Sequence, residues 1–210
     1  MQIVDLTHRI TSGMPVFPGT EPPLLEIACT LEEHGFKEKK ISMYSHTGTH
    51  MDAPAHLIAG GCTLDGFPVE KFMGRACVYR HGSVERIITV HHLSPLTEWL
   101  ASSDFLLIAT GWDRFWGEEA YFGDFPVLDA AAAQWLLQFD LKGLGLDTIS
   151  ADAMSSKDFQ VHRILLGNTM VIVENLKNLT SITGDTCDFY CLPLNLHDAD
   201  GSPVRAVARF

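Results

Sequence analysis

The sequence has few basic residues and no long apolar run, and each of these absences excludes a class of protein. It carries 15 lysines and arginines against 26 aspartates and glutamates, which gives a formal net charge of −11. Contact with nucleic-acid phosphates or with an anionic membrane needs a basic surface, so we expect neither partner. Apolar runs such as 105–109 and 170–173 are far too short to span a bilayer.

Several common sequence signals are also missing. There is no GxGxxG, no P-loop and no GxSxG, so dinucleotide, nucleotide and serine-hydrolase chemistry lack their motifs. The first residues, Met-Gln-Ile-Val-Asp-Leu-Thr-His, have neither the basic nor the apolar region of a secretion signal. The five cysteines form an odd set without a CxxC pair, which indicates reduced core thiols. We therefore expect a cytoplasmic protein.

What the sequence does have is a concentration of metal-ligand side chains in the stretch His46–His56, which reads His-Thr-Gly-Thr-His-Met-Asp-Ala-Pro-Ala-His. Its three histidines and one aspartate fall on even positions, which share a face on extended backbone. On a continuous helix Asp52 would point away from His46 and His50, and the glycine and proline of the stretch also disfavour a helix. We expect irregular backbone that leaves a strand, with a helical turn possible from Asp52, as the N-cap, onward.

The chemistry of this stretch suits a divalent metal. Imidazole nitrogens together with a carboxylate oxygen are ligands for zinc, manganese or another borderline metal. Single histidines are common on surfaces and in cores, but four ligand-type side chains within eleven residues are hard to explain structurally. By contrast, the pair His91–His92 has no carboxylate within a few residues, and we interpret it as surface.

A second, weaker group can complete such a site. His162 lies ahead of an apolar strand and Glu174 stands at the end of that strand. A carboxylate at a strand end is usually solvated, so this pair gains weight only from the first group. A dinuclear site needs about five or six ligands with a carboxylate shared between the metals, and the first group alone falls short of that number.

The hydrophobic pattern predicts a fold in which strands outnumber helices. Strands are expected at 2–6, 24–30, 39–45, 74–79, 105–110, 143–146, 170–173, 191–196 and 204–207, and helices at 93–101 and 129–139. Many connections are too short for a crossover helix, which favours a mixed, largely antiparallel sheet over a doubly wound parallel one. Without a repeat or a linker, residues 1–210 are expected to form a single domain of the α/β class, α+β-like in its layout.

The chain resembles the bacterial cyclase-like metal-dependent hydrolases, a family that includes kynurenine formamidase and isatin hydrolase. The resemblance covers nearly the whole length and rests above all on the pattern His46-x-Gly48-Thr49-His50-x-Asp52-x-Pro54-x-His56. Further matches occur in order at Asp5–His8, Met14–Gly19, Thr110–Trp112, Asp147–Asp152, His162–Arg163, Glu174–Leu176, Leu192–Leu194 and Gly201–Ala206. The resemblance implies a swivelling β/β/α fold and a metal centre.

The resemblance also implies which residues hold the metal. In formamidase-like members one metal is bound by the residues that match His46, His50 and Asp52. A second is served by those that match Asp52, His162 and Glu174, with the carboxylates bridging. All of these positions are intact in this sequence. The ions are expected to be one or two Zn²⁺, with Mn²⁺ as the alternative.

Two further residues carry expectations of their own. The residue that matches His56 is the proton donor and acceptor of the family. Phe17 stands where formamidases typically carry Trp, within the loop Ser12–Gly19 that two prolines and two glycines stiffen. From the residues alone, this loop either packs over the core or supplies an aromatic wall of a substrate pocket. We predict the second, with Phe17 lining the pocket.

The expected reaction is hydrolysis of an amide-type C–N bond. A divalent metal lowers the pKa of bound water to roughly 7, so hydroxide is available at neutral pH. His56 would then pass a proton to the departing nitrogen. The leading substrate is an aryl formamide such as N-formylkynurenine. The alternatives are a cyclic amide or lactone, as in isatin hydrolase, and a catalytically silent metal or small-ligand binding protein, although the intact His56 argues against the last. The substrate is therefore expected to be a small molecule. Separately, we expect the protein to be a homo-oligomer, either a dimer or a tetramer.

Overall fold

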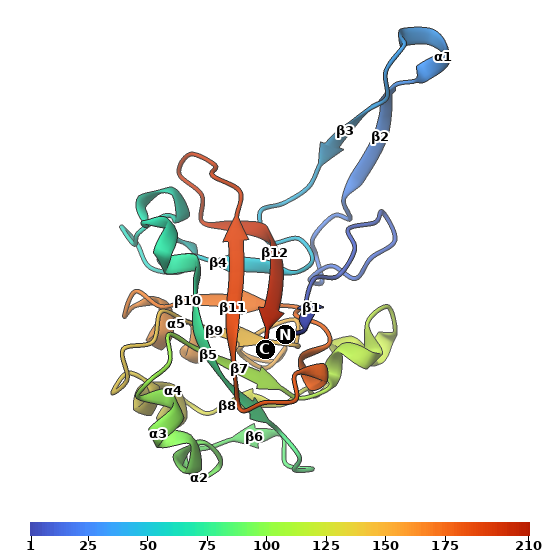
Figure 1. Ribbon diagram of the computed structural model, residues 1–210. Coiled ribbons are helices and arrows are strands. Elements are labelled where there is room, and N and C mark those ends of the chain that lie inside the picture. The colour runs from blue at the N-terminus through green and yellow to red at the C-terminus, as the bar shows by residue number, and fades with distance from the viewer.

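Eight strands form one mixed sheet in the computed structural model, which describes residues 1–210 (Figure 1). In the order in which they pair, the strands are β1 (Ile3–Asp5), β12 (Gly201–Arg209), β11 (Thr186–Pro193), β5 (Met73–Arg80), β7 (Phe105–Ala109), β9 (Gly143–Leu146), β10 (Val171–Glu174) and β4 (His50–Asp52). Strand β12 also pairs with β4, so the strands from β12 round to β4 close into a barrel-like arrangement.

The strand directions confirm the predicted mixed, largely antiparallel sheet. Five pairings in it are antiparallel and three, which join β5, β7, β9 and β10 in a row, are parallel. Every residue of β7, β9 and β10 is buried. This burial on both faces explains why these strands are continuous apolar runs and not alternating ones.

Helices cover one face of this sheet. They are α2 (Val90–Leu93), α3 (Thr97–Leu100), α4 (Ala130–Leu136) and α5 (Gln160–Leu166). Leu106 and Ile108 of β7 face these helices, whereas the alternate residues Phe105 and Leu107 pack inside the barrel. The period of two along one strand therefore supplies both halves of the core.

Several predicted element bounds need correction. The helix expected over 93–101 is divided into α2, a 3₁₀ turn (Ser94–Leu96) and α3, because Pro95 has no N–H to continue a helix. Because α2 begins at Val90, earlier than expected, the pair His91–His92 lies inside this helix and not ahead of it. Helix α4 begins at the expected N-cap, Asp129, whose Oδ1 accepts from Ala132 N at 2.6 Å, but it ends at Leu136 instead of residue 139.

Other elements also differ from the sequence prediction. Helix α5, which carries His162, was not expected at all. The strand expected at 191–196 starts earlier and ends earlier, since β11 runs from Thr186 to Pro193 with alternating burial. Its first half was missed because that alternation interleaves polar residues with the apolar ones.

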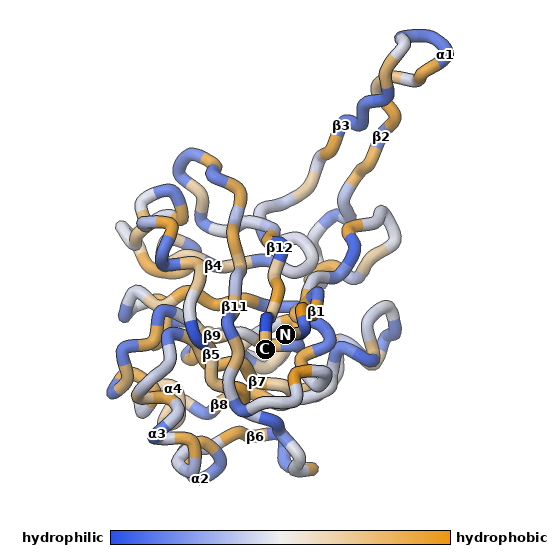
Figure 2. The backbone as a smooth tube through the Cα atoms, viewed as in Figure 1, coloured by the Kyte–Doolittle hydropathy of each residue, from blue (hydrophilic) through white to orange (hydrophobic).

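A hairpin arm projects from the body of the protein (Figure 1). It consists of β2 (Leu24–Cys29), the short helix α1 (Leu31–His34) and β3 (Glu38–Ser42), and all of β3 is exposed. Figure 2 shows apolar segments along this arm that the rest of the chain leaves uncovered. A smaller parallel pair joins β6 (Ile87–Ile88) to β8 (Val127–Leu128). No helix has the length and apolar character that crossing a membrane requires.

Candidate metal centre

Strand β4 carries two of the predicted ligands, His50 and Asp52, and is paired with another strand on each side. It pairs with β10 on one side, where His50 lies opposite Glu174, and with β12 on the other, where Asp52 lies opposite Gly201. The expectation that Asp52 caps a helical turn is therefore wrong, because its backbone is part of β4 and pairs with both neighbouring strands. The turn that follows is a 3₁₀ helix (Pro54–His56) with Ala53 at its N-cap.

The turn before β4 aims the ring of His50. Gly48 adopts a positive φ of 67°, and its carbonyl oxygen accepts from His50 Nδ1 at 2.8 Å and from Asn175 Nδ2 at 2.9 Å. Because a carbonyl can only accept, His50 carries its proton on Nδ1. Its Nε2 is left to face the carboxylates, 3.2 Å from Asp52 Oδ1 and 3.6 Å from Glu174 Oε2.

His162 reaches the same place from the first turn of α5. The carboxylate of Asp152 accepts from the backbone N–H groups of Val161 and His162 at 3.1 and 3.0 Å, and it lies 2.6 Å from His162 Nδ1. This contact turns His162 Nε2 toward Glu174 Oε1, at 3.1 Å, and Asp52 Oδ2, at 3.7 Å. A carboxylate behind an imidazole in this way is the usual support of a histidine ligand. The sequence motif contains Asp152, but its role was missed.

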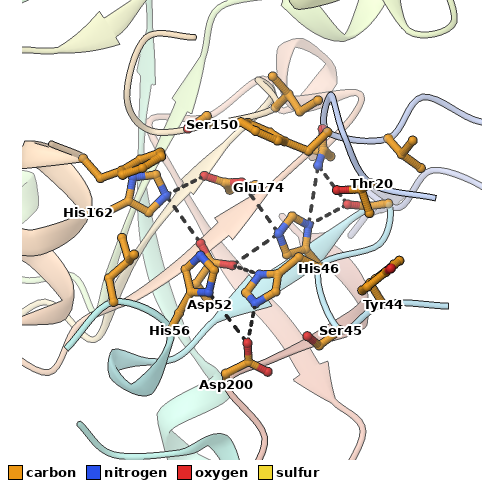
Figure 3. A pocket seen from close by; sticks show the side chains of 18 of the residues that line it. Thr20, Tyr44, Ser45, His46, Asp52, His56, Ser150, His162, Glu174 and Asp200 are labelled. Atoms are coloured by element: carbon orange, nitrogen blue, oxygen red, sulfur yellow. Dashed lines mark hydrogen bonds and ion pairs between the residues drawn. The ribbon is translucent and has the colours of Figure 1, made fainter. Parts of the chain in front are cut away.

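Asp52 joins the two groups of ligands (Figure 3). Its Oδ1 lies 2.7 Å from His46 Nδ1 and 3.2 Å from His50 Nε2, whereas its Oδ2 points toward His162. Asp52 thus belongs to two sets whose ligand atoms all lie within 4.8 Å of one another. These sets are His46, His50 and Asp52, and then Asp52, His162 and Glu174.

The charges of this cluster are buried and mutually compensated. Asp52 is 1% exposed, and burial disfavours its charge, but its contacts with His46, His162 and His50 outweigh burial and hold its pKa well below the usual range. For His46, burial likewise opposes protonation, but Asp52 and Asp200 outweigh it and raise the pKa to about 9. A buried carboxylate that stays ionised among imidazole nitrogens is the donor set that a borderline divalent metal prefers, so the residues present fit such an ion.

The predicted site residues all line one pocket of about 480 Å³. Its floor is the cluster described above, and its walls include apolar side chains of Phe17, Leu57, Ile149 and Phe159. Phe17 is 39% exposed and belongs to none of the buried clusters. Its loop therefore supplies a pocket wall here.

His56 stands beside the cluster without being held by it. Its ring lies 3.9 Å from that of His46, centroid to centroid, and its Nδ1 is 3.7 Å from Asp200 Oδ2, which is an ion-pair distance and not a hydrogen bond. Burial is the main cause that lowers the pKa of His56 below its usual value. Asp200 was missed in the sequence, where its only signal is its position directly before the Gly201–Ala206 motif.

The family model "Cyclase", described as "Putative cyclase", matches residues 4–153. The chain belongs to this family. Kynurenine formamidase from Bordetella avium is 31% identical over 98% of this chain and 96% of its own length. The kynurenine formamidase of Bacillus cytotoxicus is 30% identical, with the same shares of the two chains.

Solved structures extend the likeness of this cyclase-family protein to the fold. Isatin hydrolase A from Ralstonia solanacearum has a TM-score of 0.87 at 25% identity and covers 99% of this chain and 91% of its own. A structure described as a potential metal-dependent hydrolase with cyclase activity has a TM-score of 0.82 at 26% identity, with 99% and 96% covered. The predicted family and mixed α/β fold are confirmed, and with them the class of metal-dependent amide hydrolase. The ligand groups and these neighbours together support a divalent metal.

Proposed function

We propose that this protein hydrolyses the amide C–N bond of an aryl formamide such as N-formylkynurenine, with divalent metal held by the five clustered ligands. The observation that carries the proposal is the buried carboxylate of Asp52, which both ligand groups share at the floor of an aromatic-walled pocket. The full-length similarity to kynurenine formamidases supports the choice of substrate class.

Each group of ligands would hold one ion. His46, His50 and Asp52 would bind the first, and Asp52, His162 and Glu174 the second. Imidazole-rich sets with carboxylates suit zinc, and manganese is the alternative. When bound, such a metal polarises a carbonyl oxygen and makes water more acidic.

His56 is the residue proposed to move the proton. Because burial lowers its pKa, the imidazole is neutral near neutral pH and can accept a proton. With Nδ1 turned toward Asp200, Nε2 is the atom available to the substrate. The protonated ring would then donate to the departing nitrogen, which is poor as a leaving group without that proton.

The apolar wall would bind the aryl ring. Phe17 and Phe159 both line the pocket, and Phe159 also meets His162 edge to face at 5.9 Å between ring centroids. Aromatic pairs prefer such offset or edge arrangements, so an aryl substrate can pack between these rings while its formyl group reaches the cluster.

A second candidate substrate is a cyclic amide or lactone. Three isatin hydrolase structures share this fold at TM-scores of 0.87, 0.87 and 0.88. Both reactions cleave a bond at a carbonyl carbon with water. They differ in whether that carbon belongs to a ring or to a small formyl group.

The test compares the two substrates on one preparation. The protein would be stripped with a chelator, restored separately with Zn²⁺ and Mn²⁺, and assayed on N-formylkynurenine and isatin. We expect kcat/KM to be higher for N-formylkynurenine. Higher activity on isatin would assign the protein to the ring-opening reaction instead. Full metal binding with no turnover of either substrate would leave a silent binding protein.

We also propose that the protein is a homo-oligomer, a dimer or a tetramer. The hairpin arm supports this, since it carries exposed apolar side chains, Leu24, Ile27, Leu31, Phe36 and Ile41. An isolated two-stranded hairpin is at best marginally stable in water, and a second chain would cover it. Light scattering of the wild type should give a multiple of 23.2 kDa, and Ile27→Lys with Ile41→Lys should lower that mass. A monomeric wild type would contradict the proposal.

A further inference from the structure

Asp200 is placed beside the metal centre by the pairing of β12 with β4. Its carbonyl oxygen accepts from Ala53 N at 2.8 Å, and the next residue, Gly201, lies opposite Asp52. This register holds the backbone of Asp200 directly beside β4, the strand that carries the shared carboxylate of Asp52. Figure 3 shows its side chain pointing toward both His46 and His56.

The ring of His46 is held on three sides. Asp52 Oδ1 lies 2.7 Å from its Nδ1, and Asp200 Oδ2 lies 3.0 Å from its Nε2. A Cβ on Gly201 would come within 2.5 Å of His46 Cε1, so only glycine lets the ring lie where it does. Asp200 and Gly201 therefore fix the position of this imidazole together, one by a hydrogen bond and the other by leaving room for the ring.

The two ring nitrogens of His46 face different carboxylates, and this decides what Asp200 can do. Nδ1 faces Asp52 and the shared cluster, whereas Nε2 faces away from it toward Asp200. The two nitrogens of one imidazole point in diverging directions, so Asp200 cannot join His46 and Asp52 around one ion. Its side chain is also 48% exposed, against 2% for Asp52.

His56 is the second ring that Asp200 faces. Asp200 Oδ2 lies 3.7 Å from His56 Nδ1, and the His56 ring packs against His46 at a tilt of 38°. The same carboxylate oxygen therefore stands beside a predicted metal ligand and beside the predicted proton carrier.

We propose that Asp200 is a positioning residue that couples these two imidazoles. It holds His46 with Nδ1 presented to the first metal position and keeps His56 Nδ1 turned toward itself, so that Nε2 of His56 faces the substrate. The part that concerns His56 rests on the proposed function. A carboxylate behind a histidine ligand typically contributes 10–100-fold in metal affinity or activity, and Asp152 stands in the same relation to His162.

The experiment measures metal affinity first, because that readout does not depend on the substrate. Zn²⁺ would be titrated into the metal-free wild type, Asp200→Ala and Asp200→Asn by calorimetry. We expect Asp200→Ala to weaken one of the two binding events by about 10–100-fold without removing it. Asp200→Asn should recover part of the loss, since its amide oxygen still accepts from His46 Nε2.

A matched control separates this role from simple ordering of the loop. Asp65 accepts from Asp198 N at 3.1 Å and lies 3.5 Å from His197, so it anchors the same loop without touching the site. Asp65→Asn should bind zinc like the wild type. If Asp65→Asn weakened zinc as much as Asp200→Ala does, or if Asp200→Ala bound zinc like the wild type, the proposal would be wrong.

Kinetics at saturating zinc then test whether Asp200 also orients His56. Asp200→Ala should lower kcat with KM nearly unchanged, and Asp200→Asn should lie between it and the wild type. An unchanged kcat would overturn this role of Asp200. His46, His56 and Asp200 also lie within 4.8 Å of one another, so a third zinc equivalent that disappears in Asp200→Ala would make Asp200 a ligand instead. If the wild type bound zinc but hydrolysed no formamide, the proposed function would fail while the affinity comparison still decided the role of Asp200.

Discussion

Two regions of this molecule are rich in histidine, and only one of them has the character of a metal centre. In the first, the imidazoles of His46, His50 and His162 converge on Asp52, which is buried. In the second, around α2, His81 Nε2 donates to Glu85 O at 2.7 Å and His92 Nδ1 accepts from Thr89 N at 3.1 Å. There the rings serve the backbone, and His92 completes the cap of a helix.

The difference lies in the carboxylate and not in the number of histidines. Glu85 contacts His92 Nε2 at 3.1 Å, but its side chain is 65% exposed and water can solvate it. The Asp52 side chain is 2% exposed, so its charge must be balanced by protein groups or by a bound cation. We propose that a shared carboxylate withdrawn from water is what distinguishes the proposed cation site from the structural histidine cluster.

The largest effect should come from removing the shared charge. Asp52→Asn keeps the shape of the side chain but leaves both ligand groups without their common anion. We expect loss of metal and a fall in kcat/KM of about 10³-fold or more, since metal supplies several kcal/mol of transition-state stabilisation. The matched change in the other region, Glu85→Gln, should leave metal content and activity unchanged. If the two changes had equal effects, the burial of Asp52 would not be what distinguishes the two histidine clusters.

His56 tests whether a histidine can serve the site without binding metal. His56→Ala should keep both metal equivalents and the fold yet lose roughly 10²–10⁴-fold in kcat, the usual span of general acid–base catalysis. The loss should shrink for anilides with better leaving groups, which need less proton donation. His92→Ala should show no loss in kcat. A His56→Ala protein without metal would make His56 a ligand, and one with full activity would remove the proposed proton step.

Phe17 tests the wall of the pocket and not its floor. Phe17→Ala should raise KM for aryl formamides by roughly 10-fold, the order expected when about half of a buried aromatic contact is lost. A non-aromatic formamide should be affected much less. Equal losses on both substrates would indicate that Phe17 supports the fold instead.

His8 is a buried histidine that no carboxylate contacts, unlike the histidines around Asp52. It is 9% exposed, its ring stacks on Trp116 at 3.8 Å, and its Nε2 has no hydrogen-bond partner. Burial, helped by Lys177 and opposed by Asp5, lowers its pKa to about 4. Between pH 4 and about 6.5 the unfolded chain binds a proton at His8 that the folded chain does not, so this residue makes stability fall as pH falls.

The corresponding measurement is urea unfolding of wild type and His8→Gln at pH 7 and pH 4.5. The wild type should lose up to about 3 kcal/mol more than the variant over this range, because a pKa shift of one unit corresponds to about 1.4 kcal/mol. The contributions of all other groups are common to both proteins and cancel in the difference. Identical losses would show that His8 keeps an ordinary pKa in the folded chain.

Much of the sheet could be predicted because its parallel strands are continuous apolar runs, whereas the alternating strand β11 was found only in part. Phe105–Ala109 and Gly143–Leu146 were found within a residue, as was the N-cap at Asp129. Helix α5 was missed because its start has no side-chain cap of its own: its N-cap is Phe159 with a positive φ, and the capping carboxylate is Asp152, several residues earlier. Such a cap depends on tertiary structure.

The site divides in the same way. The residues His46, His50, Asp52 and His56 share one short stretch, so spacing and chemistry identify them together. His162 and Glu174 are each ordinary in their local sequence, so they became candidates only because the first group lacks enough ligands for a dinuclear site, and the family resemblance then supported them. Asp200 lies 148 positions after Asp52 and is brought to it only by the pairing of β12 with β4, a contact that no local pattern reveals. The capping role expected of Asp52 was wrong because of the same long-range strand pairing, which places the Asp52 backbone within β4.

The assignment of two ligand groups around Asp52 is tested most directly by metal stoichiometry. Three proteins, the wild type, His46→Ala and His162→Ala, would each be loaded with zinc, desalted and measured by elemental analysis. We expect two equivalents in the wild type and the loss of one in each variant, because His46→Ala disrupts the first group and His162→Ala the second. The double variant His81→Ala with His92→Ala should retain the wild-type content. Full metal content in both single variants would contradict the assignment of the two ligand groups around Asp52.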